Sequence, residues 1–295
     1  GGSSRTDAFR GTDLSDQFTI TSENGGVLQF TSGKGLESYQ FSGFEGIFGE
    51  GRADVFDVQL PSGVNFQGGL LGGLGEDLFQ VGTLGSVNLI DGGEDLDILD
   101  FGAFSNPVIV DVQKRAATNV GAFSRIEQIQ GGQSSQDRFL GTARSDRIDI
   151  LSDTKGTLTV PSLTGGDDTV FDFSGFESIE GAAGNDLFVI SNPVLSPFSM
   201  RLGGDAGNDV FQMLPGGGVG VIDGGADFDT INYAAFNTPV FADFRSNSAT
   251  QVGGLANMEN IVGGLSVDTL IGTDNADVFR IQSEDGGTLN AGFFS

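Results

Sequence analysis

The chain repeats itself over a long distance, and this constrains its fold more than any other feature. A step with Gly first and Asp five residues later occurs at 11–16, 141–146 and 272–277. The turn Ile-Asp-Gly-Gly at 90–93 likewise recurs at 222–225. The register is about 131 residues, and so long an internal period indicates stacked units rather than a globule with one active cleft.

The period divides the chain into two full repeats and the opening of a third. Repeat 1 covers residues 1–130, repeat 2 covers residues 131–262, and residues 263–295 start repeat 3. Both ends fall inside the pattern, and neither resembles a capping segment. We therefore expect either a longer array or copies that associate end to end.

The composition favours short strands separated by tight turns. Glycine supplies 49 of the 295 residues, and alternating apolar runs follow Gly-rich and Asp-rich turns at 55–58, 78–81 and 187–190. Turn residues followed by short alternating runs are typical of β-structure. With the period, they predict an all-β chain, a parallel β-helix or β-roll solenoid with about twenty residues per coil.

The charge and the missing residue types exclude several classes of function. A formal net charge of −26 argues against nucleic acid and anionic membrane surfaces as partners. The sequence has no Cys and no His, which excludes thiolate chemistry and removes the commonest general base. No apolar run is long enough for insertion into a membrane. The acidic excess instead favours Ca²⁺, which binds oxygen ligands.

The smallest repeated module has nine residues, with Gly at position 1, Asp at position 6 and a large apolar residue at position 8. The copies at 72–80, 181–189 and 204–212 also have Gly at position 4. Copies begin at Gly2, Gly11, Gly49, Gly72, Gly92, Gly132, Gly141, Gly181, Gly204, Gly224, Gly263 and Gly272.

This module resembles the nonapeptide G-G-x-G-x-D-x-U-x of the RTX repeat proteins, in which U is a large apolar residue. RTX nonapeptides form calcium-loaded parallel β-rolls, and the long repeat resembles the arrays of large secreted or surface-attached bacterial proteins. The resemblance implies Ca²⁺ as the cofactor and an extracellular or cell-surface location.

The module predicts where Ca²⁺ would bind. Glycines let the chain turn sharply and expose carbonyl oxygens, and the Asp at position 6 adds a carboxylate. Because Ca²⁺ takes about six to eight oxygens, loops stacked about 4.8 Å apart would share an ion. Asp54, Asp77 and Asp97 lie about twenty residues apart, as one coil requires, and Asp186, Asp209 and Asp229 repeat this pattern. The predicted metal-site residues are Gly72, Gly75, Asp77, Gly181, Gly184, Asp186, Gly204, Gly207, Asp209, Asp97, Asp229 and Asp54.

Two features leave this prediction open. Arg52, Arg144 and Leu14 replace the glycine at position 4 in other copies, and an Arg would repel a cation, so not every loop is expected to bind. The alternative is that Asp and Asn side chains join stacked turns by hydrogen bonds alone, as dry ladders.

A Glu recurs in the pattern Phe/Ile/Met-Glu-x-Ile. It could be a further metal ligand or bind turn amides at a corner, but a strand-end side chain that bends into solvent is the simpler interpretation. The four residues are Glu45, Glu127, Glu177 and Glu259.

Recurring Phe residues at strand positions predict an internal aromatic stack rather than a sugar-binding platform, since Trp is absent and Tyr is rare. They include Phe18, Phe56, Phe79, Phe188, Phe211 and Phe279.

We expect a structural protein and not an enzyme: a calcium-stabilised segment of an extracellular fibre, stalk or filament. An adhesin that binds a surface polysaccharide or a partner protein is the alternative. A β-helical polysaccharide-modifying enzyme is more remote, because the close pairs Asp95/Asp97 and Asp227/Asp229 occupy the same register in both repeats, and a duplicated turn explains them.

Overall fold

The chain is all-β. A computed structural model describes residues 7–191, 199–273, 278–283 and 286–290, with side chains as far as Thr273. Within these ranges strands are joined by turns without any helix, and accordingly no helix could span a bilayer. The residues form two compact units: residues 1–140 with 170–176 make unit 1, and residues 141–169 with 177–295 make unit 2.

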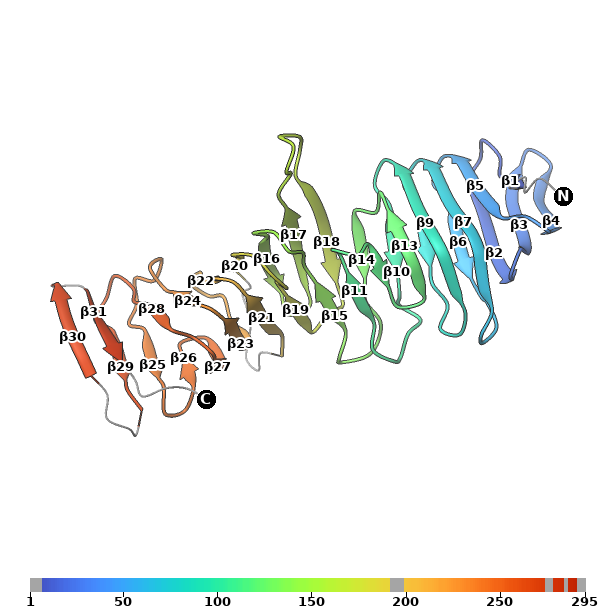
Figure 1. Ribbon diagram of the computed structural model, residues 1–295. Helices are drawn as coiled ribbons and strands as arrows, with labels where there is room; N and C mark the ends of the chain where they lie inside the picture. The colour runs from blue at the N-terminus through green and yellow to red at the C-terminus, as the bar shows by residue number, and fades with distance from the viewer. Residues whose placement is uncertain (1–6, 192–198, 274–277, 284–285, 291–295) are drawn as a thin grey trace. The chain divides into compact units, whose positions relative to one another are not determined.

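Unit 1 contains strands of two sheets, which we call sheet A and sheet B (Figure 1). In sheet A the order is β1 (Ala8–Arg10), β5 (Gly46–Gly51), β7 (Asn65–Leu74), β9 (Ser86–Glu94), β13 (Val120–Ser124), β12 (Ala116–Ala117), β11 (Ile109–Asp111) and β15 (Arg138–Leu140). In sheet B the order is β18 (Thr169–Ser174), β14 (Gln128–Gln130), β10 (Ile98–Asp100), β8 (Leu78–Gln80), β6 (Val55–Val58), β2 (Asp16–Ser22), β3 (Gly25–Ser32) and β4 (Gly35–Ser42).

Unit 2 repeats this arrangement. Its part of sheet A has the order β19 (Ser178–Glu180), β21 (Arg201–Ala206), β23 (Val219–Ala226), β27 (Val252–Ala256), β26 (Ser248–Ala249), β25 (Phe241–Asp243) and β29 (Thr269–Ile271). Its part of sheet B has the order β28 (Asn260–Val262), β24 (Thr230–Asn232), β22 (Val210–Met213), β20 (Leu187–Ile190), β16 (Arg147–Ser152) and β17 (Lys155–Val160). A separate antiparallel hairpin pairs β30 (Val278–Ser283) with β31 (Gly286–Asn290).

The chain alternates between the two sheets, and two successive strands, one in each sheet, form what we call a rung. Strand β7 of sheet A leads into β8 of sheet B, and β9 then leads into β10. Because β7 pairs with β9 and β8 pairs with β10, both in parallel, the chain advances by one rung whenever it returns to a sheet. Short parallel strands at a regular register are the coarse arrangement that the sequence predicts.

The rungs are not uniform in length. Hydrogen-bonded Asp residues in adjacent rungs are 23 or 20 residues apart in the middle of each unit. The separation grows to 38 and 40 residues at the first rung and to 30 at the last. In unit 1 the antiparallel strands β3 and β4 lengthen the first of these rungs, and the β11–β12 hairpin lengthens the last. About twenty residues per coil is therefore the wrong expectation for these rungs, because hairpins are inserted into them.

The core lies between the sheets and is built from stacked aromatic rings. Phe56 is fully buried and stacks on Phe18 at 4.8 Å and on Phe79 at 4.7 Å between ring centroids. In unit 2 Phe188 stacks on Phe211 at 4.6 Å. The predicted internal aromatic stack is confirmed for these five residues, whereas Phe279 lies outside the described side chains.

One strand of repeat 2 completes unit 1. Residues 170–176, which include most of β18, belong to repeat 2 in the sequence but to unit 1 in the structure. Strand β18 pairs in parallel with β14, so that Ile129 lies beside Phe173. The packing of unit 1 therefore depends on a segment that follows it in the chain.

We expect Phe56→Ala to lower the free energy of unfolding by about 3–5 kcal/mol, because it removes the central ring of a buried stack. Urea denaturation followed by circular dichroism measures the change. Leu84→Ala is the matched control, since Leu84 is 63% exposed and surface substitutions usually change stability by less than about 0.5 kcal/mol. Equal effects of the two substitutions would contradict the role of the aromatic stack.

Candidate functional site

A row of carboxylates joins the rungs along one edge of each unit. Each residue in the row stands immediately before a strand of sheet B, and its main-chain N–H donates to the carboxylate of the next member. We call these rows the carboxylate ladders. The unit 1 ladder is Asp16, Asp54, Asp77, Asp97 and Glu127, with N···O distances of 2.7, 2.7, 2.9 and 3.0 Å. The unit 2 ladder is Asp146, Asp186, Asp209, Asp229 and Glu259, with distances of 2.7, 2.7, 2.8 and 2.9 Å.

The main chain runs in parallel with this side-chain row. The carbonyl oxygen of Asp54 accepts the N–H of Leu78 at 2.8 Å, and the carbonyl of Asp77 accepts the N–H of Ile98 at 2.8 Å. Both faces of a ladder residue are thus held, and all eight ladder Asp residues are at most 2% exposed. The ladders are consequently rigid parts of the fold rather than mobile surface groups.

The second carboxylate oxygen distinguishes two kinds of loop. In six ladder residues Oδ2 is buried and has no hydrogen-bond partner: Asp54, Asp77, Asp97, Asp186, Asp209 and Asp229. In Asp16 and Asp146, by contrast, Oδ2 accepts the N–H of Thr12 at 2.6 Å and of Thr142 at 2.7 Å. Unpartnered buried oxygens of this kind are rare in folded proteins, because each loses its hydration without compensation.

The backbone of the residue after the first glycine separates the two kinds of loop. In the six loops with an unpartnered oxygen this residue has positive φ, between 70° and 123°: Glu50, Gly73, Gly93, Ala182, Asp205 and Gly225. Thr12 and Thr142 are not among the positive-φ residues. The Gly-Thr loops therefore present their N–H to the carboxylate, whereas the other six follow a different path.

The glycine at position 1 is required by close packing rather than by its φ. A Cβ on Gly72 would lie 2.0 Å from Asp77 Oδ2 and 2.3 Å from the carbonyl oxygen of Gly92. Position 4 is different, because Gly75, Gly184 and Gly207 have φ of 108°, 117° and 124°, values that L-residues rarely adopt. Arg52 occupies this position with a φ of 77° and donates its Nε–H to the carbonyl of Asp13 at 3.0 Å.

Burial changes the acidity of the ladder carboxyls. It raises the pKa of Asp54 and Asp186 to about 8, that of Asp77, Asp97 and Asp209 to about 7, and that of Asp229 to about 6. Desolvation is the main cause, and the donated N–H of the neighbouring ladder residue opposes it. Exposed carboxylates nearby add to the rise in pKa, since Asp95 acts on Asp77 and Asp97, and Asp205 on Asp186 and Asp209.

The predicted metal-site residues are brought together as the sequence indicates, with additions. Asp54, Asp77 and Asp97 lie in one ladder and their three counterparts in the other, beside the turn glycines Gly75, Gly184 and Gly207. Gly72, Gly181 and Gly204 lie against the carboxylates of Asp77, Asp186 and Asp209. The first and last members of each ladder were not predicted. The Asp277 loop lies outside the described residues.

The recurring Glu residues bind turn amides. Glu127 Oε2 accepts the N–H of Asp97, and Glu259 Oε2 accepts that of Asp229. On the sheet A side Glu45 Oε2 accepts the N–H of Asp7 at 2.9 Å. The interpretation of these three as strand ends that bend into solvent is therefore wrong. Their position directly before a strand, where the ladder Asp residues also stand, is the signal that could have identified them.

Among the described residues no three acidic side chains converge as a ready-made ligand set for a metal. The oxygens that do approach each other are of two kinds. Asp77 Oδ2 and the carbonyl oxygen of Gly92 both lie against Gly72, and Asp209 Oδ2 and the carbonyl oxygen of Gly224 both lie against Gly204. A cation at these loops would therefore take main-chain oxygens as well as one carboxylate from each rung.

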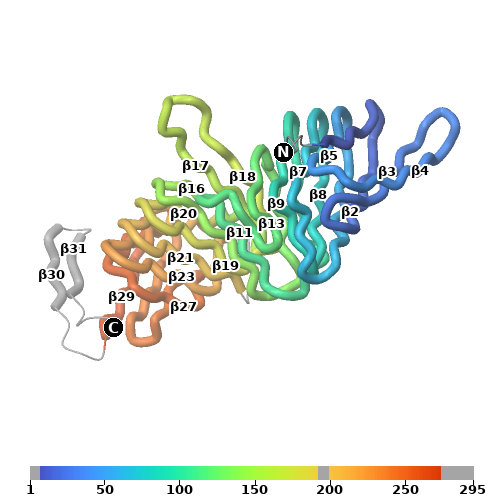
Figure 2. The backbone as a smooth tube through the Cα atoms, turned by 45° about the vertical axis from the view of Figure 1, so that its right-hand side comes forward, coloured from blue at the N-terminus to red at the C-terminus, as the bar shows by residue number. Residues whose placement is uncertain are grey.

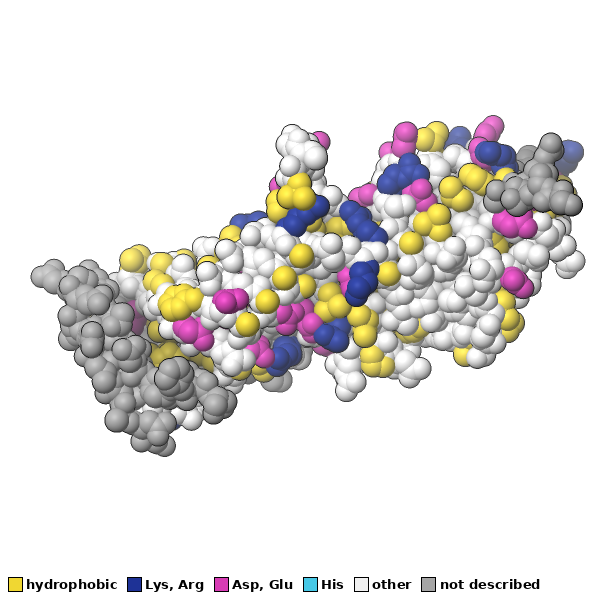
Figure 3. Space-filling model, in the orientation of Figure 1, with side chains coloured by type: hydrophobic (Ala, Val, Ile, Leu, Met, Phe, Trp, Pro, Cys, Tyr) yellow, Lys and Arg dark blue, Asp and Glu magenta, His cyan; other side chains and the backbone are white. Residues whose placement is uncertain are grey.

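The paired carboxylates are used structurally. Asp97 is buried in the ladder, whereas Asp95 is exposed and its Oδ2 accepts the N–H of Gly75 at 3.1 Å. In Figure 3 the acidic side chains on the face in view are scattered rather than gathered in one patch. The two carboxyls of this pair thus serve different rungs.

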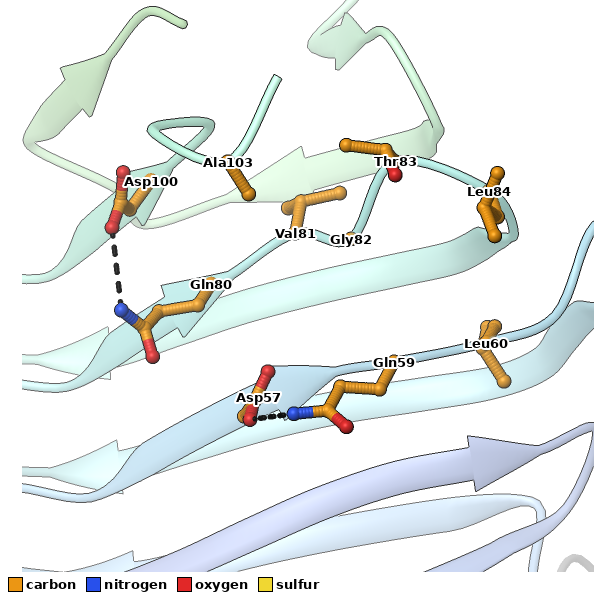
Figure 4. Close-up of a pocket in the computed structure, with 10 residues that line it drawn as sticks. All are labelled: Asp57, Gln59, Leu60, Gln80, Val81, Gly82, Thr83, Leu84, Asp100 and Ala103. Carbon is orange, nitrogen blue, oxygen red and sulfur yellow. Dashed lines mark hydrogen bonds between the residues drawn. The ribbon is translucent and has the colours of Figure 1, made fainter. Parts of the chain in front are cut away.

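A polar hollow of about 460 Å³ lies beside the ends of β6, β8 and β10 in unit 1. Figure 4 shows Gln80 donating to Asp100 at 3.4 Å and Gln59 donating to Asp57 at 2.5 Å. In repeat 2 the positions of Asp57 and Asp100 are taken by Val189 and Asn232. The hollow is therefore a feature of unit 1 whose carboxylates are not repeated.

No family model matches this chain, and no curated protein is significantly similar to it.

We expect Gly72→Ala to destabilise the chain strongly, since the new methyl would overlap both the Asp77 carboxylate and a main-chain carbonyl. The matched control is Gly51→Ala in the neighbouring loop, where an added Cβ meets nothing within 4 Å. Thermal unfolding measures both, with a loss of about 1–3 kcal/mol or more expected for Gly72→Ala and little change for Gly51→Ala. Equal melting temperatures for the two variants would contradict the packing argument.

We expect the metal-free chain to lose stability as the pH rises. The raised pKa values mean that the folded chain binds more protons than the unfolded chain between the unfolded pKa near 3.8 and the folded values of about 6 to 8. Stability from these groups is therefore complete below about pH 4 and is lost as the pH rises through the folded pKa values.

Urea denaturation in chelator at pH 5 and pH 8 measures this change. Repulsion among the exposed carboxylates acts in the same direction, so the comparison must include Asp77→Asn. The variant should show a smaller loss between the two pH values than the native chain, and an identical loss would refute the contribution of Asp77.

Proposed function

We propose that the chain is a structural segment: a parallel β-solenoid in which Ca²⁺ bound at the ladder loops joins adjacent rungs. Such a segment would form part of an extracellular or cell-surface fibre, stalk or filament. The role is mechanical, so that no catalytic group is assigned.

The observation that carries this proposal is the set of six buried carboxylate oxygens without a donor. A buried anionic oxygen is costly unless a proton, a hydrogen-bond donor or a cation compensates it. The six occur as two sets of three at equivalent positions, which indicates that the arrangement is selected rather than accidental. The Gly-Thr loops demonstrate that the same backbone can supply a donor where none is needed from outside.

Ca²⁺ suits these loops better than other ions. It accepts carboxylate and main-chain carbonyl oxygens in flexible geometry, and those are the two kinds of oxygen that converge on the position 1 glycines. The exposed Asp95, Asp205 and Asp227 stand near the ladders and could complete the coordination with water. The residues that would hold the ions are Asp54, Asp77, Asp97, Asp186, Asp209 and Asp229 with the carbonyl groups of the neighbouring glycines.

Calcium would also relieve the charge of the chain. With 40 acidic and 14 basic residues the folded state repels itself, and cations between rungs offset this repulsion. Extracellular modules bind Ca²⁺ with dissociation constants of about 10⁻⁴ to 10⁻³ M, so such loops would be filled outside cells and empty in a low-calcium cytoplasm. Folding and stiffness would then be coupled to the compartment.

Asp77→Asn tests this proposal. The Asn oxygen still accepts the N–H of Asp54, while the amide NH₂ replaces the unpartnered oxygen and can donate to the carbonyl of Gly92. We expect the variant to be more stable than the native chain in chelator by about 1–3 kcal/mol, because the uncompensated oxygen is gone. It should gain less than the native chain from millimolar Ca²⁺, since one ligand is lost.

Asp137→Asn is the control, since both of its oxygens already accept main-chain N–H groups, from Val108 at 2.8 Å and Gly132 at 2.7 Å. It should be destabilised with and without Ca²⁺, and its gain from Ca²⁺ should equal that of the native chain. If chelation leaves the melting temperature of the native chain unchanged, the calcium proposal fails and ladders neutralised by protons remain.

A binding module is the second candidate, and the polar hollow of unit 1 favours it. Amide and carboxylate groups at Asp57, Gln80 and Asp100 could hold the hydroxyl groups of a surface polysaccharide. This alternative would make one unit functionally distinct from the other, whereas the ladders are common to both.

A further inference from the structure

The outer edge of β4 is an open strand edge in unit 1. Among the described residues β4 pairs only with β3, in eight consecutive antiparallel pairs without a bulge. Natural sheet edges are usually shielded by proline, charged side chains, bulges or short length. Strand β4 has eight residues, no proline and a single charged residue, Glu37, and it exposes Leu36 at 71% and Tyr39 at 50%. Figure 2 shows the β3–β4 hairpin, in blue, projecting from unit 1.

The internal repeat shows what an edge of this type binds. Strand β18 is the counterpart of β4 in repeat 2, since the sequence Phe-Ser-Gly-Phe-Glu at 41–45 recurs at 173–177. Strand β18 pairs in parallel with β14, with Gln128 beside Asp172 and Ile129 beside Phe173. The main-chain bonds Asp172 N–H to Glu127 O, at 2.8 Å, and Gly131 N–H to Ser174 O, at 2.7 Å, close this joint.

Burial follows the presence of the partner strand. Phe171 is fully buried, with the guanidinium of Arg115 4.9 Å from its ring centre, whereas its counterpart Tyr39 is half exposed. Ile129 is 1% exposed, whereas its counterpart Ile261 in β28 is only partly buried. Strand β28 pairs only with β24 among the described residues. The two halves of a second joint of the β14–β18 type are therefore present, one on β4 and one on β28.

The aromatic cluster behind the joint is already formed at β4. Phe41 stacks on Phe9 at 4.4 Å and Phe44 packs on Phe9 at 5.2 Å. The counterparts at the completed joint make the same contacts, at 5.0 Å between Phe139 and Phe173 and 5.3 Å between Phe139 and Phe176. A partner strand would thus meet a preorganised surface, which lowers the entropy lost on binding.

We propose that β4 of one copy of this chain binds the outer edge of β28 of a second copy, in parallel and in the register of the β14–β18 joint. Gln40 then lies beside Asn260, Phe41 beside Ile261, and Ser42 beside Val262. The surfaces are different on the two partners, so the contact is heterologous and repeats into a filament. This inference rests on the proposed structural function, for which it names the partner.

The docked arrangement requires an exchange of strands. Strand β29 pairs with β25 as β15 pairs with β11, and β1 is the counterpart of both β15 and β29. The β1 strand of an incoming copy would therefore take the place of β29. Assembly should consequently be fastest when chains refold together at high concentration, as in domain swapping.

Cysteine cross-linking tests the register, and the chain has no native Cys to interfere. Paired residues on neighbouring strands lie about 5 Å apart, within the range that a disulfide spans. The test variant carries Gln40→Cys and Asn260→Cys. The control variant carries Ser38→Cys and Asn260→Cys, which keeps the same face but moves the pair out of register by two residues. Gln128→Cys with Asp172→Cys should form an internal disulfide and reports that oxidation was effective.

After refolding at high concentration and mild oxidation, the test variant should give at least about tenfold more covalent dimers and longer ladders than the control on a non-reducing gel, since only in-register Cα atoms lie within disulfide reach. Equal cross-linking of the two variants, or monomers alone, would overturn the proposal. Equal dimer formation by Gln40→Cys alone would also overturn it, because β4 would then pair with β4.

Running each sample with Ca²⁺ and with chelator separates this inference from the calcium proposal. In-register cross-links in chelator would stand even if Ca²⁺ had no effect on melting. A calcium-dependent melting temperature without register-specific cross-links would leave the ladders as proposed and remove the joint.

Discussion

The hydrogen bond from a main-chain N–H to the carboxylate of the next ladder residue is the interaction on which the rest of the structure depends. It fixes each loop on its neighbour at one point, directly before a strand of sheet B, and so sets the register of the strand that follows. The strand register in turn places Phe56 between Phe18 and Phe79. The core and the loops are therefore aligned by the same contact, repeated once per rung.

This contact has an electrostatic consequence. Using Oδ1 for the ladder leaves Oδ2 facing the glycine at position 1, where a side chain would overlap it. The loop must then choose between a main-chain donor, as Thr12 provides, and an oxygen that needs compensation from outside, as in Asp77. The same nonapeptide thus makes permanently satisfied loops and loops whose stability depends on pH or on cations.

The sequence predicted the all-β class, the middle rungs and the aromatic stack because glycine, Asp and Phe recur at fixed spacing. It also placed Asp54, Asp77 and Asp97 along one edge. It did not predict the inserted hairpins, since β3 and β4 have no glycine-to-aspartate module. Nor did it identify Glu127 and Glu259 as ladder ends, because their equivalence to Asp depends on three-dimensional position. The difference between Asp16 and Asp77 depends on backbone φ, which the motif alone does not encode.

The placement of β18 bears on how the chain can be divided. The polypeptide leaves unit 1 after residue 140, runs through residues 141–169 of unit 2, and returns for residues 170–176 before it leaves again. A fragment cut at the end of repeat 1 would lack the strand that covers β14, with Ile129 left bare. The repeats are thus not interchangeable cassettes: a recombinant boundary that respects the packing has to fall after Phe176, where the sequence alignment shows no border.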